Sequence, residues 1–246
     1  MKIDILAIGA HPDDVELSCG GTLAAMAQQG KKTGILDLTC GEMSTRGTPQ
    51  TRLDEAKEAA DILGLTIREN AGLPDCGLEN SMTQRKPVIR AIRTCQPDIC
   101  FIPPLSDRHP DHQNAARLVI DALFYAGLSK LETSTESGKK QQPWRPAHII
   151  HFMQHWPFQP TFVFDITETL HIKEKAILAY RSQFNAEPGN GPETYISGKT
   201  FFDSIRARAR EYGQQSGLTY GEPFLYYGAP IPVQSLDQFL QARVKR

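Results

Sequence analysis

Two short segments of the chain gather residues that can bind a metal ion. The first reads HPDD at residues 11–14, is followed by Glu16, and comes directly after an apolar run. The second reads SDRHPDH at residues 106–112. Adjacent carboxylates repel one another unless a positive charge lies near them, and a metal ion supplies such a charge. Catalytic zinc sites commonly use three imidazole or carboxylate ligands and keep a fourth position for water.

Each segment alone also has a purely structural explanation. Pro at the first helical position and Asp in the first turn are typical of helix starts. The coincidence of two HPD sequences, each expected at the carboxyl end of a strand, favours the metal site. His109 and His112 are three positions apart, so a helix would direct both to the same side. The spacing alone does not choose between them as the ligand.

Strand-like and helix-like segments alternate along the chain, which indicates βαβ units and a mainly parallel sheet. We expect strands at residues 3–10, 33–39, 65–69, 98–102, 148–154 and 161–167, and helices at 18–29, 51–63, 81–94, 109–125, 168–184 and 201–213. The predicted fold class is α/β, a Rossmann-like sheet flanked by helices, in one domain over residues 1–246. Because ligands collect outside the carboxyl ends of parallel strands, both HPD segments should meet at one edge.

The composition is that of an ordinary soluble protein and excludes several classes. Hydrophobic residues make up 40% of the 246 residues and charged residues 22%, with a formal net charge of -1. No basic stripe indicates a nucleic-acid partner. No apolar run reaches the ~20 residues of a membrane span, and no signal peptide is recognisable, so we expect a cytoplasmic protein. The five cysteines are scattered without a C-x-x-C pair, which predicts reduced thiols.

Two further segments have open interpretations. Residues 129–146 are polar and rich in Ser, Thr, Lys and Gln, and we interpret them as a mobile surface excursion, either without a role or altering the pocket rim. The segment HIIHFMQH places three histidines, His148, His151 and His155, close together. Strand alternation turns His148 and His151 to opposite faces, which argues against a second metal site.

The motifs taken together resemble those of a known family. AHPDDVE at residues 10–16 and HPDH at 109–112 are similar to the LmbE-like zinc deacetylases, also called the PIG-L family. GEMSTRGTPQTRLDEA, LPDCGL, DRHPDHQNAARLV and AYRSQF resemble the bacillithiol-biosynthesis deacetylases. The resemblance extends from Ile3 to about Tyr227, with Leu17-Ser18-Cys19 as a departure that affects packing. It implies a Rossmann-like, often hexameric zinc hydrolase that removes the acetyl group from N-acetylglucosaminyl malate.

The resemblance also implies a role for each residue of the two segments. The zinc ligands would be His11, Asp14 and His112, and ferrous iron accepts the same ligand types. Asp13 would be the general base that takes a proton from water, an assignment that suits a carboxylate beside a ligand. His109 would stabilise the oxyanion together with zinc, and Asp111 would orient His109.

Malate carries two carboxylates, so a malate conjugate requires cationic partners in the pocket. Arg52 matches a substrate-contacting arginine of the bacillithiol branch, and Arg108 adjoins the histidines; both could pair with carboxylates in bidentate geometry. Arg46 stays open between function and surface charge, and Glu16 between a solvated helix-start acid and a supporting hydrogen bond.

Three alternatives to the malate conjugate remain. One is a deacetylase of another N-acetylglucosamine conjugate, such as a mycothiol precursor or an antibiotic sugar, and another is a deacetylase of chitin fragments. The third is a non-catalytic metal- or carbohydrate-binding module. Expected partners are a small amino-sugar conjugate and further copies of the chain, with neither nucleic acid nor membrane.

Overall fold

The computed structural model describes residues 2–184, 192 and 194–232, which build one seven-stranded sheet. The strands lie in the order β3-β2-β1-β4-β5-β7-β6. Their bounds are β1 Ile5–Gly9, β2 Thr33–Thr39, β3 Ile67–Leu73, β4 Ile99–Ile102, β5 His148–Phe152, β6 Phe162–Asp165 and β7 Gly221–Tyr227. The pairs from β3 to β5 are parallel, and β7 runs antiparallel to β5 and β6. The expected α/β, mainly parallel fold is confirmed.

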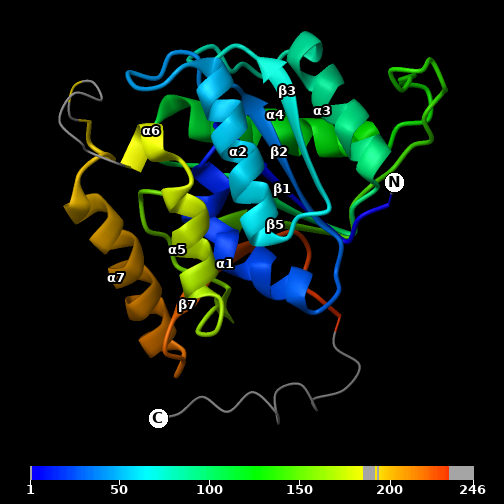
Figure 1. Ribbon diagram of the computed structural model, residues 1–246. Coiled ribbons are helices and arrows are strands. Elements are labelled where there is room, and N and C mark those ends of the chain that lie inside the picture. The colour runs from blue at the N-terminus through cyan, green and yellow to red at the C-terminus, as the bar shows by residue number, and fades with distance from the viewer. Residues whose placement is uncertain (1, 185–191, 193, 233–246) are drawn as a thin grey trace.

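Helices cover both faces of the sheet, so the molecule has three layers (Figure 1). The helices are α1 Asp14–Gln28, α2 Pro49–Leu63, α3 Met82–Cys95, α4 Pro110–Ala126, α5 Leu170–Leu178, α6 Arg181–Phe184 and α7 Lys199–Gln215. One hydrophobic cluster joins the sheet to α3 and α4, and a second joins it to α1, α2 and α5. Helix α7 packs against β6 and β7.

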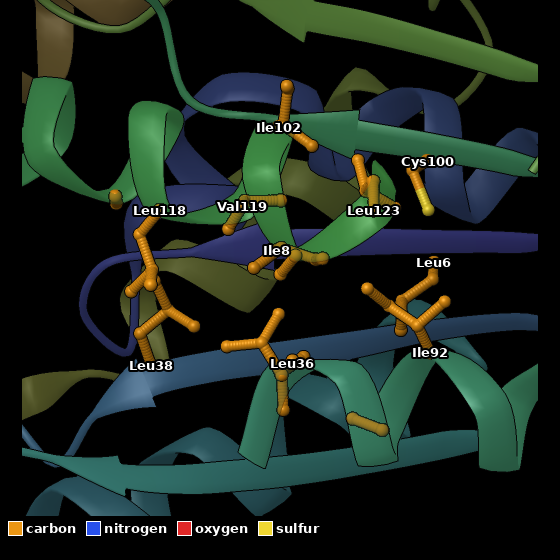
Figure 2. Close-up of a cluster of buried hydrophobic side chains, with 14 of the residues drawn as sticks. Leu6, Ile8, Leu36, Leu38, Ile92, Cys100, Ile102, Leu118, Val119 and Leu123 are labelled. Carbon is orange, nitrogen blue, oxygen red and sulfur yellow. The ribbon is translucent and has the colours of Figure 1, made fainter. Parts of the chain in front are cut away.

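The central strands supply side chains to both layers. In β1, Leu6 and Ile8 belong to the cluster on the α3–α4 face, and Ile5 and Ala7 belong to the cluster on the opposite face. Figure 2 shows the first of these clusters, in which Leu6 lies beside Ile92 of α3 and Ile8 lies beside Val119 of α4. This alternation follows from the two-residue period of a strand, and burial on both faces explains why β1 is apolar throughout.

Several element boundaries differ from the prediction. Helix α1 begins at Asp14 rather than at residue 18, so the first metal-binding segment leads directly into a helix. The predicted helix 168–184 is divided into α5 and α6. The sequence pattern did not predict β7, because Pro223 interrupts GEPFLYY and a proline usually demotes a strand. Phe224 of β7 is buried, with its ring stacked on Phe101 at 4.9 Å.

The polar segment 129–146 lies far from the carboxyl ends of the parallel strands. Its Trp144 indole N–H donates to the carbonyl of Pro97 at 2.7 Å, just before β4, and Lys2 lies over the Trp144 ring. Arg93 donates to the carbonyls of Ala126, Leu128 and Leu131, which fixes the start of the segment. Figure 1 shows it beside the amino terminus. The interpretation that this segment alters the pocket rim is therefore wrong.

Among the described residues, no helix has both the length and the apolar character needed to cross a bilayer. All five cysteines are free thiols, as predicted, and Cys95 and Cys100 are buried.

Candidate metal centre and cavity

Pairing of β1 with β4 brings the two HPD segments together at one edge of the sheet, as expected. Asp13, the N-cap of α1, has a φ of 104°, a left-handed conformation that is rare for residues other than glycine. This conformation accompanies the sharp turn from β1 into α1. The two adjacent carboxylates have different partners as a result: Asp13 contacts Arg52, whereas Asp14 contacts His11 and His112.

His11, Asp14 and His112 form a compact group of potential ligands. His11 Nδ1 lies 3.3 Å from Asp14 Oδ2, and His112 Nε2 lies 3.2 Å from Asp14 Oδ1. One donor atom from each residue lies within 4.8 Å of the others. Two imidazoles and one carboxylate, with a remaining face open to the cavity, fit the donor set of a catalytic metal site.

The other ring nitrogen of each histidine faces a second carboxylate. His11 Nε2 lies 3.0 Å from Asp75 Oδ1, and His112 Nδ1 lies 2.5 Å from Asp107 Oδ2. Such bonds fix which nitrogen points toward a metal and increase the basicity of the ligand. The sequence reasoning missed both carboxylates. The available signal was their position, since Asp75 follows β3 and Asp107 follows β4 at the edge that carries the ligands.

The carboxylates create a strongly negative environment around the histidines. Burial opposes the positive charge of His112, but Asp14 and Asp107 outweigh it and raise the pKa of His112 to about 9. Burial is likewise outweighed at His11, where Asp111, Asp14 and Asp75 raise the pKa. A field that favours a proton on each imidazole also favours a metal cation between them, so the residues fit a divalent cation.

Asp13 is buried with an exposed fraction of 5%, and its Oδ2 lies 3.1 Å from Arg52 Nη2. Burial, only partly offset by Arg52, raises the pKa of Asp13 to about 7. A carboxyl group with such a pKa can accept and release a proton near neutral pH, which is what general-base catalysis requires.

The Arg52 guanidinium lines the cavity but is held by the protein itself. It donates to the Pro12 carbonyl and to Asp13, and it lies 5.6 Å from the centre of the Tyr180 ring. Arg46, the other arginine of this region, is buried and donates through Nε to the Ser182 carbonyl at 2.8 Å.

Glu16 is fully buried beneath the centre. It accepts hydrogen bonds from Arg68 Nη1 at 2.5 Å and from the Tyr180 hydroxyl at 2.9 Å. Of the two interpretations left open for Glu16, the supporting hydrogen bond is the one found, and the solvated acid is not.

His109 is the N-cap of α4, and its ring centre lies 4.9 Å from that of His11 and 5.1 Å from that of His112. Its Nδ1 accepts a hydrogen bond from the backbone N–H of Asp111 at 3.2 Å. Burial, His11 and His112 lower the pKa of His109, so a neutral ring with its proton on Nε2 is favoured. The contact predicted between Asp111 and His109 is thus made by the main chain. The Asp111 carboxylate instead accepts from the Cys76 N–H at 2.7 Å.

The centre opens into a cavity of about 460 Å³, a volume typical of small-molecule sites. Arg108 lies at the cavity with its guanidinium 4.7 Å from the centre of the Tyr195 ring. Gln154 and Arg208 complete the wall near His112. Every residue that the sequence predicted for the site lines this cavity except Asp111, which lies directly behind it.

The three later histidines do not form a second centre. His151 is buried and its Nδ1 bonds the Pro103 carbonyl, while His155 lines the cavity edge beside Tyr195. Within the described part of the chain, none of His148, His151 and His155 joins a group of metal-binding side chains.

Comparison with known proteins places this arrangement among deacetylases. The family model PIG-L, described as GlcNAc-PI de-N-acetylase, matches residues 6–123. Diacetylchitobiose deacetylase of Thermococcus kodakarensis is 28% identical over 89% of this chain and 80% of its own length.

Two solved structures are similar over nearly the whole fold. A conserved protein of Thermus thermophilus has 39% identity and a TM-score of 0.82, with 94% of this chain and 97% of that chain covered. The N,N'-diacetylchitobiose deacetylase of Pyrococcus horikoshii has 26% identity and a TM-score of 0.77, with 91% and 83% covered.

Proposed function

We propose that this chain, an N-deacetylase similar over residues 6–123 to the PIG-L family of de-N-acetylases, removes the acetyl group from N-acetylglucosaminyl malate in bacillithiol biosynthesis. The observation that carries the choice of substrate is the guanidinium of Arg108 at the cavity, which has no carboxylate partner among the described residues, beside that of Arg52, which is paired with Asp13. A malate conjugate supplies carboxylates for such cations, whereas diacetylchitobiose, the substrate in the names of two relatives, carries no charge.

His11, Asp14 and His112 would hold the metal, which we propose to be Zn²⁺, with Fe²⁺ accepted by the same ligand types. When bound, the metal supplies a Lewis acid that polarises the acetamide carbonyl and lowers the pKa of a bound water. Asp75 and Asp107 keep the two imidazoles oriented for this purpose by accepting their outer N–H groups.

The remaining steps belong to the side chains around the metal ligands. Asp13 takes the proton of the attacking water as general base and later delivers it to the leaving amine. Arg52 holds the Asp13 carboxylate in place and favours its ionised form. The Nε2–H of His109 is available to donate to the developing oxyanion, because the Asp111 main chain occupies Nδ1.

The test is a substrate panel of N-acetylglucosaminyl malate, N-acetylglucosamine and diacetylchitobiose, with acetate release measured on protein of known metal content. We expect the malate conjugate to have by far the highest kcat/KM, because remote carboxylate contacts help to orient the amide. Arg108→Ala should reduce this preference without abolishing turnover. Equal kcat/KM values for all three substrates would refute the malate assignment and leave the deacetylase activity intact.

We also propose that the protein is a cytoplasmic homo-oligomer, with a hexamer as the expected state. The support is the family resemblance. Of the aromatic residues late in the chain, Tyr227 is 42% exposed, whereas Phe224 is buried in the core. Light scattering at the working concentration measures the mass, and a monomer mass would contradict this proposal.

A further inference from the structure

Arg208 of α7 extends into the wall of the catalytic cavity. Its Nη1 donates to the Gln154 carbonyl, and its Nη2 donates to the Leu17 carbonyl at 3.2 Å. Leu17 belongs to α1, the helix that begins at Asp14, and the Gln154 side-chain amide lies 3.4 Å from His112 Nε2. The guanidinium is therefore fixed in position by the same two segments that surround the metal ligands.

Arg208 lacks the counter-ion that comparable arginines have. Within the described residues, no carboxylate lies within 4.0 Å of its guanidinium nitrogens, whereas Arg206 pairs with Glu174 through two bonds of 2.6 Å. Arg52 and Arg68, at and beneath the centre, also pair with carboxylates. Arg208 thus differs from its neighbour on the same helix and from Arg52 and Arg68, and among the described residues it shares the lack of a carboxylate partner with Arg108.

The surroundings of Arg208 make an unpaired cation costly. Burial lowers the pKa of Arg208, and Glu222 and Asp107 only partly oppose this effect. Arg208 is only partly exposed, and a partly buried cation is stabilised by a charged partner better than by neutral carbonyls. The two carbonyls also engage only two of the five N–H donors of the guanidinium. An anion bound in the cavity would supply the missing partner.

We propose that Arg208 is the specificity-determining residue that binds a carboxylate of the substrate's aglycone, the part attached to the amino sugar. This inference rests on the proposed N-deacetylase reaction on an anionic glucosaminide, and it adds a residue that the motif resemblance does not include. The planar guanidinium can bind a carboxylate through two parallel hydrogen bonds. Arg208 differs from Arg52, because Arg52 is already paired with the Asp13 carboxylate and Arg208 has no such partner among the described residues.

The experiment uses the full-length, metal-loaded enzyme and pairs of substrates that differ only in charge. The pairs are N-acetylglucosaminides of malate, lactate and glycolate and the corresponding methyl esters. The variants are Arg208→Met, which keeps much of the side-chain volume, Arg208→Lys, which keeps the charge, and Arg206→Gln as a control on the same helix. Circular dichroism and the melting temperature establish that each variant is folded.

For Arg208→Met we expect KM for the acid substrates to rise about 10- to 100-fold, the range of a charge-assisted hydrogen bond, with kcat little changed. KM for the esters should change by less than about two-fold, because an ester presents no charge to a guanidinium. Arg208→Lys should restore part of the affinity, since it keeps the charge without the planar fork. Arg206→Gln should leave both substrate classes unchanged.

An equal effect of Arg208→Met on acids and esters would overturn the inference, because it would indicate a structural role or contact with the acetyl end. If Arg208→Met does not fold, Arg208→Lys and the wild type decide: an unchanged KM of the lysine variant for the acids overturns the inference. A wild-type preference for lactate over malate would refute the malate assignment alone. A wild-type enzyme that does not distinguish acids from esters would refute both.

Discussion

The two neighbouring aspartates of HPDD differ in the partners that the fold gives them. Asp14 lies between the two histidines, and Asp13 lies against Arg52. We predict that Asp14→Ala lowers metal content and activity together. Asp13→Asn should keep the metal but lower kcat by about 100- to 10,000-fold, the usual effect of removing a general base. Metal analysis beside steady-state kinetics distinguishes the two, and metal loss in Asp13→Asn with retention in Asp14→Ala would reverse the assignment.

The pH dependence of the reaction tests the same residue independently. Asp13 must be ionised to accept a proton, so kcat/KM should increase as the pH rises through its pKa. Burial places that pKa at about 7 without a metal, and a bound cation would lower it, so the acidic limb should have its midpoint at or below 7. Profiles of wild type and Asp13→Asn provide the measurement. An acidic limb that persists unchanged in Asp13→Asn would assign it to another group.

Asp107 is expected to influence metal binding through its contact with His112, one of the three proposed ligands. It is fully buried and accepts from His112 Nδ1 and from the backbone N–H groups of His155 and Trp156. In Asp107→Asn, the amide can still accept from the backbone but no longer provides a negative charge to His112. We expect metal affinity to fall about 10- to 100-fold, as for other such partners of metal ligands.

Competition with a chromogenic chelator measures the affinity of Asp107→Asn without reference to activity. Asp98→Asn is a suitable control, because Asp98 precedes β4 at the opposite edge of the sheet and pairs with Lys2 near the surface. Equal metal affinity in Asp107→Asn and wild type would show that the negative charge of Asp107 is not needed to position His112.

At the scale of elements, helix α1 depends on a residue of β7. The helix is interrupted at Cys19, whose φ and ψ are −134° and 20°. The backbone N–H groups of Gly21 and Thr22 donate to the Glu222 carboxylate at 3.0 and 2.7 Å, and Lys173 pairs with the same carboxylate. Glu222 therefore caps the second half of α1 and also joins it to α5 and β7.

We predict that Glu222→Gln lowers the free energy of unfolding by about 3–5 kcal/mol, because the buried Lys173 loses its counter-ion. Urea denaturation measures the change through the midpoint at constant m. Glu58→Gln, which removes the exposed pair with Arg181, is the matched control and should cost only about 0–1 kcal/mol. A loss in Glu222→Gln no larger than in Glu58→Gln would mean that the network contributes little.

The sequence predicted the strands whose carboxyl ends carry the proposed metal ligands. It did not reveal the more distant residues that complete the site. Strand 33–39 was predicted with its observed bounds, since β-branched and apolar residues between turn signals mark a buried strand. The proximity of the HPD segments followed from the parallel order of β1 and β4. Asp75, Asp107 and Arg208 were not identified, because their roles arise from contacts between distant segments that leave no local pattern. Whether residues 1–246 form one domain stays a prediction.

At the scale of the whole molecule, the segment 129–146 lies near the amino end of β4, whereas the HPD segments follow the carboxyl ends of β1 and β4. We predict that replacing residues 135–139 by Asn-Gly, a common two-residue hairpin turn, leaves kcat/KM within about two-fold. The bridge between Ser134 and Lys140 supports such a short connection. Kinetics and a melting curve on the shortened protein provide the check, and a several-fold change in KM would restore a role for the segment at the pocket.

The distance in sequence between Glu222 and α1 has a consequence for synthesis on the ribosome. The three proposed metal ligands lie between residues 11 and 112, so they leave the ribosome before Arg208 and Glu222 do. However, Arg208 can line the cavity only after α7 has left the exit tunnel. Glu222 can cap the second half of α1 only after β7 has left it. A nascent chain would therefore carry the proposed ligands incompletely supported until β7 and α7 emerge. Stable metal acquisition is expected to be a late, post-translational event rather than a nucleus for folding.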